Sequence, residues 1–246
     1  MAAEREERLE RAASFGGVAD AYERARPGYP DDAVRWLTGE TPREVVDLGA
    51  GTGKLTRSLV ALGHRVTAVE PLEEMLVELQ RAVPGARAVV GSAEAIPLPD
   101  GSTDVVTCAQ AFHWFDESPA LVEIARVLRP GARLGLVWNT RDEREAWVQE
   151  LSDVMVGRTD FLRRVPGQIE ASGRYEPVEQ AEFAHVQEID RESLRELVLS
   201  RSFCAVLPPA EREPVLRGVD ALFTAHARDG VLRLPYVTVC FRAVRR

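Results

Sequence analysis

The sequence predicts an α/β protein built on a mostly parallel β-sheet that is covered by helices on both faces. Two observations lead to this fold class. From residue 44 to residue 138, short runs of consecutive apolar residues alternate with segments of helical character, which is typical of parallel strands buried on both faces. A turn with glycines at 49, 51 and 53 joins the first apolar run to the helix after it, as in sheets that bind a ligand at the ends of their strands.

The individual elements follow from composition and stop signals. Helices stop at Gly63 and before Pro84-Gly85, because these residues do not continue a helix. The C-terminal third breaks the alternation, and its last strand is expected either at a sheet edge or as an inserted antiparallel strand. The result is a Rossmann-like sheet of seven strands with an N-terminal helical lid and a C-terminal insertion. The expected strands are 45–48, 65–69, 86–90, 103–109, 133–138, 178–189 and 232–243, and the expected helices are 18–26, 31–37, 55–62, 73–82, 119–128, 191–199 and 210–227, with further helices in 141–175.

The length of 246 residues suits one large α/β domain. We expect residues 1–246 to form a single domain, with the helical lid in 1–40, a ligand-binding core in 41–140, and a substrate-side insertion with the final strands in 141–246. The oligomeric state does not follow from the sequence.

Composition and charge exclude several function classes. The net charge of −8 disfavours nucleic acids and anionic membranes as partners. The cysteines at 108, 204 and 240 lie far apart and lack metal-ligand spacing, so no metal site is expected. The charged N-terminus has no apolar signal segment, and no run reaches the roughly 20 apolar residues of a membrane span. We expect a cytoplasmic protein.

The stretch DLGAGTG, residues 47–53, is the most informative part of the chain. A glycine turn before a helix lets a ligand approach the backbone, and the helix N-terminus offers N–H groups. A phosphate-binding P-loop is excluded, since Leu48 replaces its first glycine and Leu55 follows Lys54. A dinucleotide fingerprint is weakened because Lys54 stands where its third glycine belongs.

The acidic residues around this turn indicate a different ligand. Asp47 beside close-approach glycines suits a cationic amine better than a pyrophosphate. Glu70, which ends the second expected strand, is placed to accept hydrogen bonds from two ribose hydroxyls. S-adenosylmethionine combines a ribose and an amino-acid end and has no phosphate. A turn that binds nothing is the alternative.

On these motifs the sequence resembles the class I S-adenosylmethionine-dependent methyltransferases. Within that family it is similar to the small-molecule branch of ubiquinone/menaquinone-type and trans-aconitate-like enzymes. The matching pieces are VDLGAGTG at 46–53, VEP at 69–71, GSAEAIPL at 91–98, DVV at 104–106 and LRPGA at 128–132.

The resemblance implies a role for each matching position. Asp47 and the Gly49 carbonyl would hold the methionyl ammonium, Gly51 would leave room beside Ala50, and Glu70 would bind the ribose. The adenine would lie among Pro71, Leu72 and Met75 and meet the backbone of Ala93 and Glu94. Ser92 stands where many relatives have an aspartate.

In the lid, the resemblance implies that Tyr22 and Arg26 contact the cofactor and that Tyr29 contacts the cofactor or the substrate.

The segment after the fourth expected strand should face the transferable methyl group, since ligands sit at the carboxyl ends of parallel strands. Gln110 and Ala111 would line the sulfonium pocket. His113 is a candidate general base, because its ordinary pKa lies near neutrality; the alternative is that His113 packs structurally, with Trp114 covering the cofactor. Candidate substrate contacts are Tyr29, Trp114, Asn139, Arg141 and Arg201, and a pocket lined by the two arginines would favour a carboxylate-bearing acceptor.

The sequence therefore predicts an enzyme that transfers a methyl group from S-adenosylmethionine to an oxygen, nitrogen or carbon atom of a small molecule. Two alternatives stay open at this point. One is a nicotinamide-dependent oxidoreductase, and the other is a protein that binds S-adenosylmethionine without catalysis. A nucleic-acid methyltransferase is disfavoured, because no Asn-Pro-Pro-Tyr or Asp-Pro-Pro-Tyr sequence follows the fourth strand.

Overall fold

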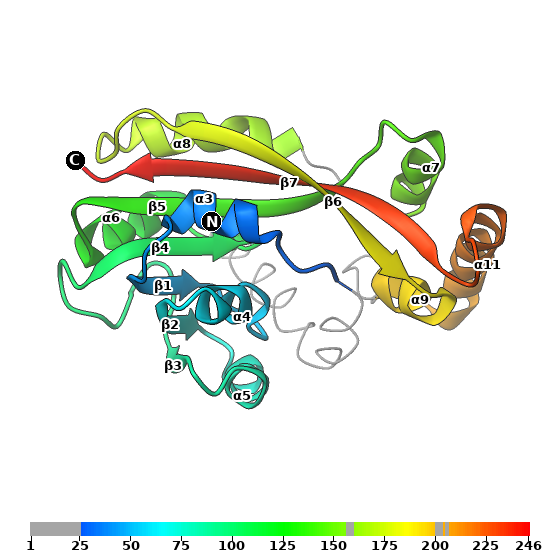
Figure 1. The fold of residues 1–246 in the computed structure, drawn as a ribbon, viewed down its shortest axis with the longest axis horizontal. Coiled ribbons are helices and arrows are strands. Elements are labelled where there is room, and N and C mark those ends of the chain that lie inside the picture. Colours follow the sequence, from blue (N-terminus) through cyan, green and yellow to red (C-terminus); the bar gives the residue numbers. More distant parts are fainter. Residues whose placement is uncertain (1–25, 156–159, 200–203, 205–206) are drawn as a thin grey trace. The chain divides into compact units, whose positions relative to one another are not determined.

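A computed structural model describes residues 26–155, 160–199, 204 and 207–246 (Figure 1). Seven strands form one sheet in the order β3-β2-β1-β4-β5-β7-β6. The strands are β1 (Glu44–Leu48), β2 (Arg65–Glu70), β3 (Arg87–Val90), β4 (Thr103–Ala109), β5 (Leu128–Arg141), β6 (Glu179–Ile189) and β7 (Leu232–Val244). The predicted fold class, a seven-stranded and mostly parallel Rossmann-like sheet, is confirmed.

Parallel pairing joins the first five strands. β1 lies between β2 and β4, with Asp47 opposite Ala68 on one side and opposite Thr107 on the other. β7 is antiparallel to its neighbours: Gly131 of β5 donates to the Arg245 carbonyl, and Tyr175, just before β6, pairs with Arg245 in an antiparallel bridge. Of the two positions that the sequence left open for the last strand, the structure has the inserted antiparallel one.

The helices follow the expected segments closely. The described helices are α3 (Asp31–Thr38), α4 (Lys54–Ala61), α5 (Glu73–Ala82), η2 (Phe112–Trp114), α6 (Glu117–Val127), α7 (Ala146–Val154), η3 (Asp160–Arg164), α8 (Val165–Ala171), α9 (Arg191–Leu199) and α11 (Pro209–His226). The predicted helix over 18–26 lies outside the described residues, apart from its last position.

The chain divides into two compact units. The first, here called the sheet unit, comprises Gly28–Asn139, Thr159–Phe183 and Thr238–Arg246. The second unit comprises Met1–Pro27, Thr140–Arg158 and Ala184–Val237. The predicted subdivision into lid, core and insertion stays a prediction.

Helices cover both faces of the sheet unit, with α3 and α4 in front of the strands and α6 and α8 behind them in Figure 1. On the first face, apolar residues of three helices pack on alternate residues of the strands, which buries their side chains away from water. Tyr175 on the other face is buried and donates from its hydroxyl to the Leu121 carbonyl of α6. The shared core of the first face includes Ala33, Val34, Leu37, Leu55, Leu59, Leu76, Leu79, Val45, Val66, Ala68, Val105, Val137 and Cys240.

The second unit has its own apolar core. It is formed by residues of α7, α9 and α11 together with the first part of β7, among them Val148, Leu151, Leu194, Leu197, Val198, Val219, Phe223, Leu232 and Leu234. The three cysteines of the chain are buried and reduced, which agrees with their prediction as small buried apolar residues.

Candidate active site

The glycine turn lies between the end of β1 and the start of α4. Gly49, Gly51 and Gly53 all have positive φ, at 67°, 55° and 91°, a conformation that favours glycine. The N–H groups of Gly49 and Ala50 donate to the Val69 carbonyl at 2.8 and 3.2 Å. The turn is therefore tied to the carboxyl end of β2, beside Glu70.

The three glycines have different surroundings. A Cβ atom at Gly49 would lie 2.8 Å from the Cβ atom of Ala111, and one at Gly53 would lie 2.9 Å from the Cγ atom of Leu79. At Gly51, the nearest atom to such a Cβ is the sulfur of Met75, at 3.9 Å. Gly49 and Gly53 thus make room for the protein itself, whereas at Gly51 the described residues leave space in which a ligand can approach the backbone.

Asp47 is a buried carboxylate, 1% exposed, in the penultimate position of β1. The Thr56 hydroxyl of α4 donates to its Oδ2 atom at 2.6 Å, and the Thr107 hydroxyl of β4 donates to its Oδ1 atom at 3.2 Å. Burial raises the pKa of Asp47 to about 6, although both hydroxyls oppose the shift. The site therefore holds a carboxylate that would gain from a cationic ligand.

Glu70 is the second buried carboxylate, 6% exposed, at the last position of β2. The Gly51 N–H donates to its Oε2 atom at 3.0 Å and the Leu72 N–H to its Oε1 atom at 3.2 Å. Burial raises the pKa of Glu70, while these two backbone hydrogen bonds lower it. Each carboxylate oxygen has a further lone pair with which it can accept a hydrogen bond from a ligand hydroxyl.

The residues predicted to surround a purine follow β2 and β3. Pro71 is exposed, Met75 is half-buried and Ala93 is buried. Ser92 and Ala95 form a short antiparallel bridge, so the backbone turns at Ala93 and Glu94. The Glu94 carboxylate accepts the N–H of Asp116 at 2.9 Å, which ties this turn to the start of α6.

The segment after β4 lies against the glycine turn, because Ala111 packs on Gly49. Gln110, directly after β4, has a φ of 56°, which is unusual for a residue with a side chain. Its N–H donates to the Val137 carbonyl at 2.9 Å and its Nε2 atom to the Asn139 carbonyl at 3.2 Å. Strained backbone of this kind is concentrated at functional sites, and here it turns the chain directly before Ala111, which packs on Gly49.

Comparison with known proteins identifies the family. A family model described as a methyltransferase domain matches residues 46–136. An uncharacterized methyltransferase of Mycobacterium tuberculosis is 46% identical over 239 residues, which is 96% of this chain and 97% of the relative. The chain belongs to the class I S-adenosylmethionine-dependent methyltransferases. The nicotinamide-dependent alternative is thereby set aside.

Solved methyltransferase structures share the fold. A putative type II methyltransferase from Anaeromyxobacter dehalogenans is 25% identical, with a TM-score of 0.60, and the match covers 89% of this chain and 97% of that one. A phosphoethanolamine N-methyltransferase of Haemonchus contortus, solved with S-adenosylhomocysteine and phosphomonomethylethanolamine, is 17% identical, with a TM-score of 0.52 over 87% of this chain and 52% of that one.

As a member of this family, the protein uses S-adenosylmethionine as its cofactor. The residues of the sheet unit fit it. The open space at Gly51 accommodates a ligand close to the backbone, Asp47 offers a negative charge for an ammonium group, and Glu70 offers acceptors for hydroxyl groups. When bound, the cofactor supplies an electrophilic methyl group on a positively charged sulfur atom.

His113 lies in η2 of the methyltransferase, and aromatic rings surround it. Its ring centroid is 4.9 Å from that of Trp114 and 4.9 Å from that of Phe161. The buried indole of Trp138, in β5, donates from Nε1 to the Nδ1 atom of His113 at 3.5 Å. In the structure, His113 therefore contacts Trp114, Trp138 and Phe161.

The other predicted substrate contacts are distributed over both units. In the sheet unit, the Asn139 side chain accepts from the Thr238 hydroxyl at 2.7 Å and donates to the Gly28 carbonyl at 2.9 Å, and Tyr29 packs against the core of the first face. In the second unit, Arg141 donates from Nε to the Ser152 hydroxyl at 2.7 Å, and burial lowers its pKa. Tyr22 and Arg201 lie outside the described residues.

Arg26 completes the predicted set of site residues that the structure describes, and two histidines outside that set have partners within the fold. The positive charge of Arg26 acts on Arg141, which places both guanidinium groups in one region of the second unit. His64 accepts the N–H of Arg43 at 3.2 Å, and His185 stacks on Tyr236.

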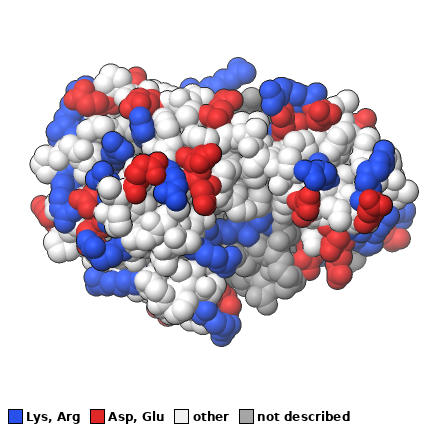
Figure 2. All heavy atoms as spheres, viewed as in Figure 1, with Lys and Arg blue, Asp and Glu red and all other residues white. Residues whose placement is uncertain are grey.

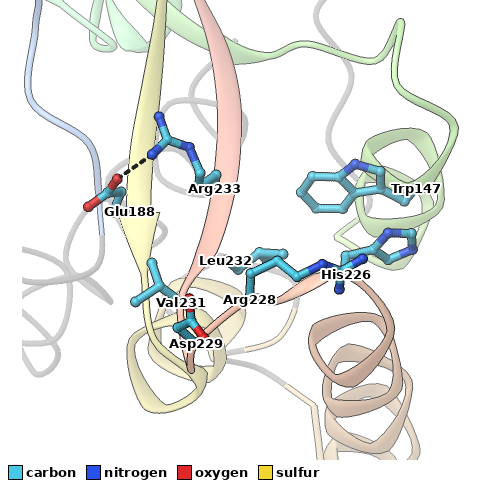
Figure 3. A pocket seen from close by; sticks show the side chains of 8 residues that line it. All are labelled: Trp147, Glu188, His226, Arg228, Asp229, Val231, Leu232 and Arg233. Atoms are coloured by element: carbon cyan, nitrogen blue, oxygen red, sulfur yellow. Dashed lines mark hydrogen bonds and ion pairs between the residues drawn. The ribbon is translucent and has the colours of Figure 1, made fainter.

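A cavity of about 420 Å³ lies in the second unit (Figure 3). The ring of Trp147 stacks on His226 with centroids 5.2 Å apart, and Glu188 pairs with Arg233 at 2.7 Å across β6 and β7. The lining of this cavity contains none of the residues that the sequence analysis assigned to a site. Its lining residues are Trp147, Glu188, His226, Arg228, Asp229, Val231, Leu232 and Arg233.

Sequence reasoning missed the hydroxyl partners of Asp47. Thr107 interrupts the apolar residues 105–109 of β4, and it stands opposite Asp47 in the parallel register of β1 and β4. Thr56 lies in the first turn of α4. A polar residue inside a buried strand was the available signal, because such a group requires a hydrogen-bond partner.

Proposed function

We propose that the protein transfers the methyl group of S-adenosylmethionine to an oxygen, nitrogen or carbon atom of a small-molecule acceptor. The small ligand named with the Haemonchus contortus enzyme supports this class of acceptor. The single observation that carries the proposed cofactor site is the pair of buried carboxylates, Asp47 and Glu70, at the carboxyl ends of β1 and β2, which the glycine turn joins.

In this proposal each part of the cofactor meets a different element. Asp47 and the Gly49 carbonyl hold the ammonium group, because an ionised carboxylate and a carbonyl oxygen both accept from N–H donors. Glu70 holds the ribose hydroxyls. The remaining proposed cofactor contacts are Ala50, Gly51, Pro71, Leu72, Met75, Ser92, Ala93, Glu94, Gln110 and Ala111 in the sheet unit, and Tyr22 and Arg26.

The proposed acceptor contacts are Tyr29, Trp114, Asn139, Arg141 and Arg201. Arg141 supports an acceptor with a carboxylate group, because a half-buried guanidinium favours an anionic partner. Within the described part of the chain, Arg141 forms no ion pair, and its one hydrogen bond goes to the Ser152 hydroxyl.

Charge and hydropathy support the remaining parts of the proposal. The face in Figure 2 carries acidic and basic side chains interspersed, which gives no support to a nucleic-acid partner. Among the described helices, none is long and apolar enough to cross a membrane. The proposed location is the cytoplasm, which the reduced state of the three buried cysteines supports.

Calorimetric titration with S-adenosylhomocysteine, with NADH as a parallel ligand, tests the cofactor site. We expect micromolar binding of S-adenosylhomocysteine and none of NADH. Glu70→Gln and Asp47→Asn each remove one charge and keep the side-chain shape. Because a hydrogen bond to a charged group contributes about 1.5–3 kcal/mol, each variant should weaken binding about 10- to 150-fold.

Asp104→Asn is the matched control. Asp104 also accepts a backbone N–H, from Glu44 at 2.9 Å, but it lies at the amino end of the sheet, in the second position of β4. Its variant should bind S-adenosylhomocysteine like the wild type. Unchanged affinity in both the Asp47 and Glu70 variants would contradict the proposed site.

A further inference from the structure

The inference concerns an arginine cluster at the amino end of the sheet, away from the glycine turn. It consists of Arg35 in α3, Arg43 directly before β1, Arg133 in β5 and Arg242 in β7. All four residues belong to the sheet unit, in which Leu37 of α3 lies against Gly135 of β5 (Figure 1). Arg133 stands opposite Val105 of β4, and Val105 opposite Val45 of β1. The cluster is therefore level with the first residues of β1.

The guanidinium groups of Arg43 and Arg133 meet beside Gly39. A Cβ atom at Gly39 would have only guanidinium nitrogens as its three nearest neighbours, among them Nη2 of Arg43 at 3.6 Å and Nη1 of Arg133 at 3.7 Å. These two nitrogen atoms are thus at most 7.3 Å apart, the sum of the two distances. Gly39 itself contributes no side chain that could separate the two groups.

Neither of these two guanidinium groups forms a hydrogen bond or an ion pair with the described residues. The Nε atom of Arg43 is buried and has no hydrogen-bond partner there. Buried polar atoms in native proteins are nearly always paired, and an unpaired one requires an explanation such as an ion. A guanidinium has five N–H donors, no acceptor and a permanent positive charge, so the partner that suits both groups is an anion.

The acidic residues of this region are already paired with other arginines. Within the cluster, Glu40 pairs with Arg35 at 3.2 Å, and Glu179 pairs with Arg242 at 2.7 Å. The other two acids of the region pair with arginines outside the cluster, Glu44 with Arg65 and Asp104 with Arg129. Among the described residues, four positive charges of the cluster thus meet two carboxylates, and two positive charges are left over.

The uncompensated charge acts on neighbouring groups. Burial lowers the pKa of Arg133, and the positive charges of Arg242 and Arg43 lower it further, against the opposite effect of Glu179. Burial also lowers the pKa of His64, and the charges of the cluster add to this shift. Since like charges that lie close together repel one another, a bound anion would stabilise the cluster.

We propose that Arg43 and Arg133 form a binding site for a phosphate group, either free inorganic phosphate or the phosphate of a monoester. The charge of about −2 on such a group matches the two arginines that no acid pairs with. Its oxygen atoms allow both guanidinium groups to bind at once, whereas the two oxygens of a carboxylate match a single guanidinium. Two charge-assisted hydrogen bonds of about 2.8 Å each, together with the width of one phosphate group, fill the separation between the two arginines.

The proposed phosphate site is separate from the proposed cofactor site. Asp47 and Glu70 lie at the carboxyl ends of β1 and β2, whereas Arg43 precedes β1. The two sites are therefore at opposite ends of the strands, and phosphate should bind equally well with and without S-adenosylhomocysteine. The inference does not depend on the methyltransferase function.

The alternative is a purely structural role for the two arginines. The last carbonyl groups of a helix are partially negative and favour nearby cations, and the Trp36 carbonyl of α3 accepts from Arg242 in this way. Arginines that only stabilise the end of α3 would respond to phosphate no more than to chloride. The difference between these two ions therefore decides between the roles.

Titration of the full-length protein with inorganic phosphate and with glycerol phosphate, followed by 31P NMR at constant ionic strength, measures binding directly. We expect saturable binding with a Kd of about 1 mM or below. Thermal unfolding at the same ionic strength should show a rise in Tm with phosphate that chloride and acetate do not produce. Tighter binding of glycerol phosphate would identify the ligand as a monoester, and equal or tighter binding of inorganic phosphate would identify it as the free ion.

Substitutions test whether the two arginines hold the phosphate. Arg43→Gln and Arg133→Gln each remove one guanidinium and should weaken phosphate binding about tenfold or more. Arg43→Lys and Arg133→Lys keep the charge but should still weaken binding about threefold, because an ammonium lacks the two parallel N–H donors. Arg81→Gln is the matched control, since Arg81 is an exposed arginine of α5 that pairs with Glu78, and it should bind phosphate like the wild type. If a glutamine variant does not fold, the lysine variant at that position provides the test.

Three results would overturn the proposal. One is a rise in Tm that chloride reproduces at the same ionic strength, because this indicates charge screening only. The second is phosphate binding that persists unchanged in the Arg43 and Arg133 variants, and the third is a preference for acetate over phosphate. Failure of the wild type to bind S-adenosylhomocysteine would contradict the proposed cofactor site and would leave the phosphate site unaffected.

Discussion

Replacing Asp47 with asparagine should make the cofactor-free protein more stable at neutral pH, although it removes a residue of the proposed cofactor site. Asp47 is buried in the sheet unit, where its carboxylate accepts hydrogen bonds from the hydroxyls of Thr56 and Thr107 and from the backbone of Thr56. Without a cationic ligand, its negative charge is therefore stabilised by hydrogen bonds alone. Asparagine has nearly the same shape and carries no charge.

The magnitude follows from the pKa of Asp47. Burial raises this pKa from 3.8 to about 6, and each pKa unit corresponds to about 1.4 kcal/mol. Because the pKa is higher in the native state, the native protein still holds this proton between pH 4 and 6, whereas the unfolded chain has released it. The free energy of unfolding therefore falls as the pH rises through this range. Above pH 6, ionised Asp47 lowers the free energy of unfolding by about 3 kcal/mol relative to the protein with Asp47 protonated. One weakened hydrogen bond offsets about 1 kcal/mol of the gain in the variant, which leaves about 2 kcal/mol.

Urea denaturation followed by tryptophan fluorescence at pH 4.5, 6.0 and 7.5 measures this effect. The variant should equal or fall slightly below the wild type at pH 4.5 and exceed it by about 2 kcal/mol at pH 7.5. Asp104→Asn provides a control of opposite sign. Burial raises the pKa of Asp104, but hydrogen bonds from the Glu44 N–H and from Arg129 outweigh it and lower this pKa, so its variant should lose stability at pH 7.5. Parallel pH curves for the wild type and Asp47→Asn would refute the reasoning.

Two further predictions use the same geometry. At pH 6, binding of S-adenosylhomocysteine should release part of a proton from Asp47, because an ammonium beside the carboxylate lowers its pKa; calorimetry in buffers of different ionisation enthalpy detects this release, and identical heats would contradict it. Gly49→Ala should destabilise the fold by at least about 2 kcal/mol, since its Cβ would lie 2.8 Å from that of Ala111 at a φ of 67°. Gly51→Ala should lower the stability by only about 1 kcal/mol, because alanine is strained at a positive φ but meets no close neighbour here. The same variant should weaken S-adenosylhomocysteine binding about tenfold or more. Equal stability losses in the two variants would show that Gly51 does not border open space.

The parallel half of the fold was predictable because its signals are local. Apolar runs of four to seven residues identified β1 to β4 within one or two residues of their observed ends. Glycine and proline marked the helix ends at Gly63 and Pro84. These residues act on the backbone through their own φ preferences and missing donors, so their effect does not depend on distant parts of the chain.

Strand extent and order in the C-terminal half were less predictable. β5 extends from Leu128 to Arg141, well beyond the expected 133–138. The insertion of β7 between β5 and β6 depends on pairing between strands that are distant in sequence. Apolar alternation shows that a strand has a buried face, but the choice of neighbour is made by contacts such as that of Gly131 with Arg245.

By itself, the sequence determined the glycine turn at 49–53, the acids Asp47 and Glu70 beside it, and the family to which they point, because these features lie in short segments whose spacing is fixed by the chain. Only the tertiary structure decided how those groups are used. It set Thr107 against Asp47 across the parallel register and placed the indole of Trp138 on Nδ1 of His113. Such contacts join residues of different elements, and the packing of the core, not sequence spacing, determines which side chains meet.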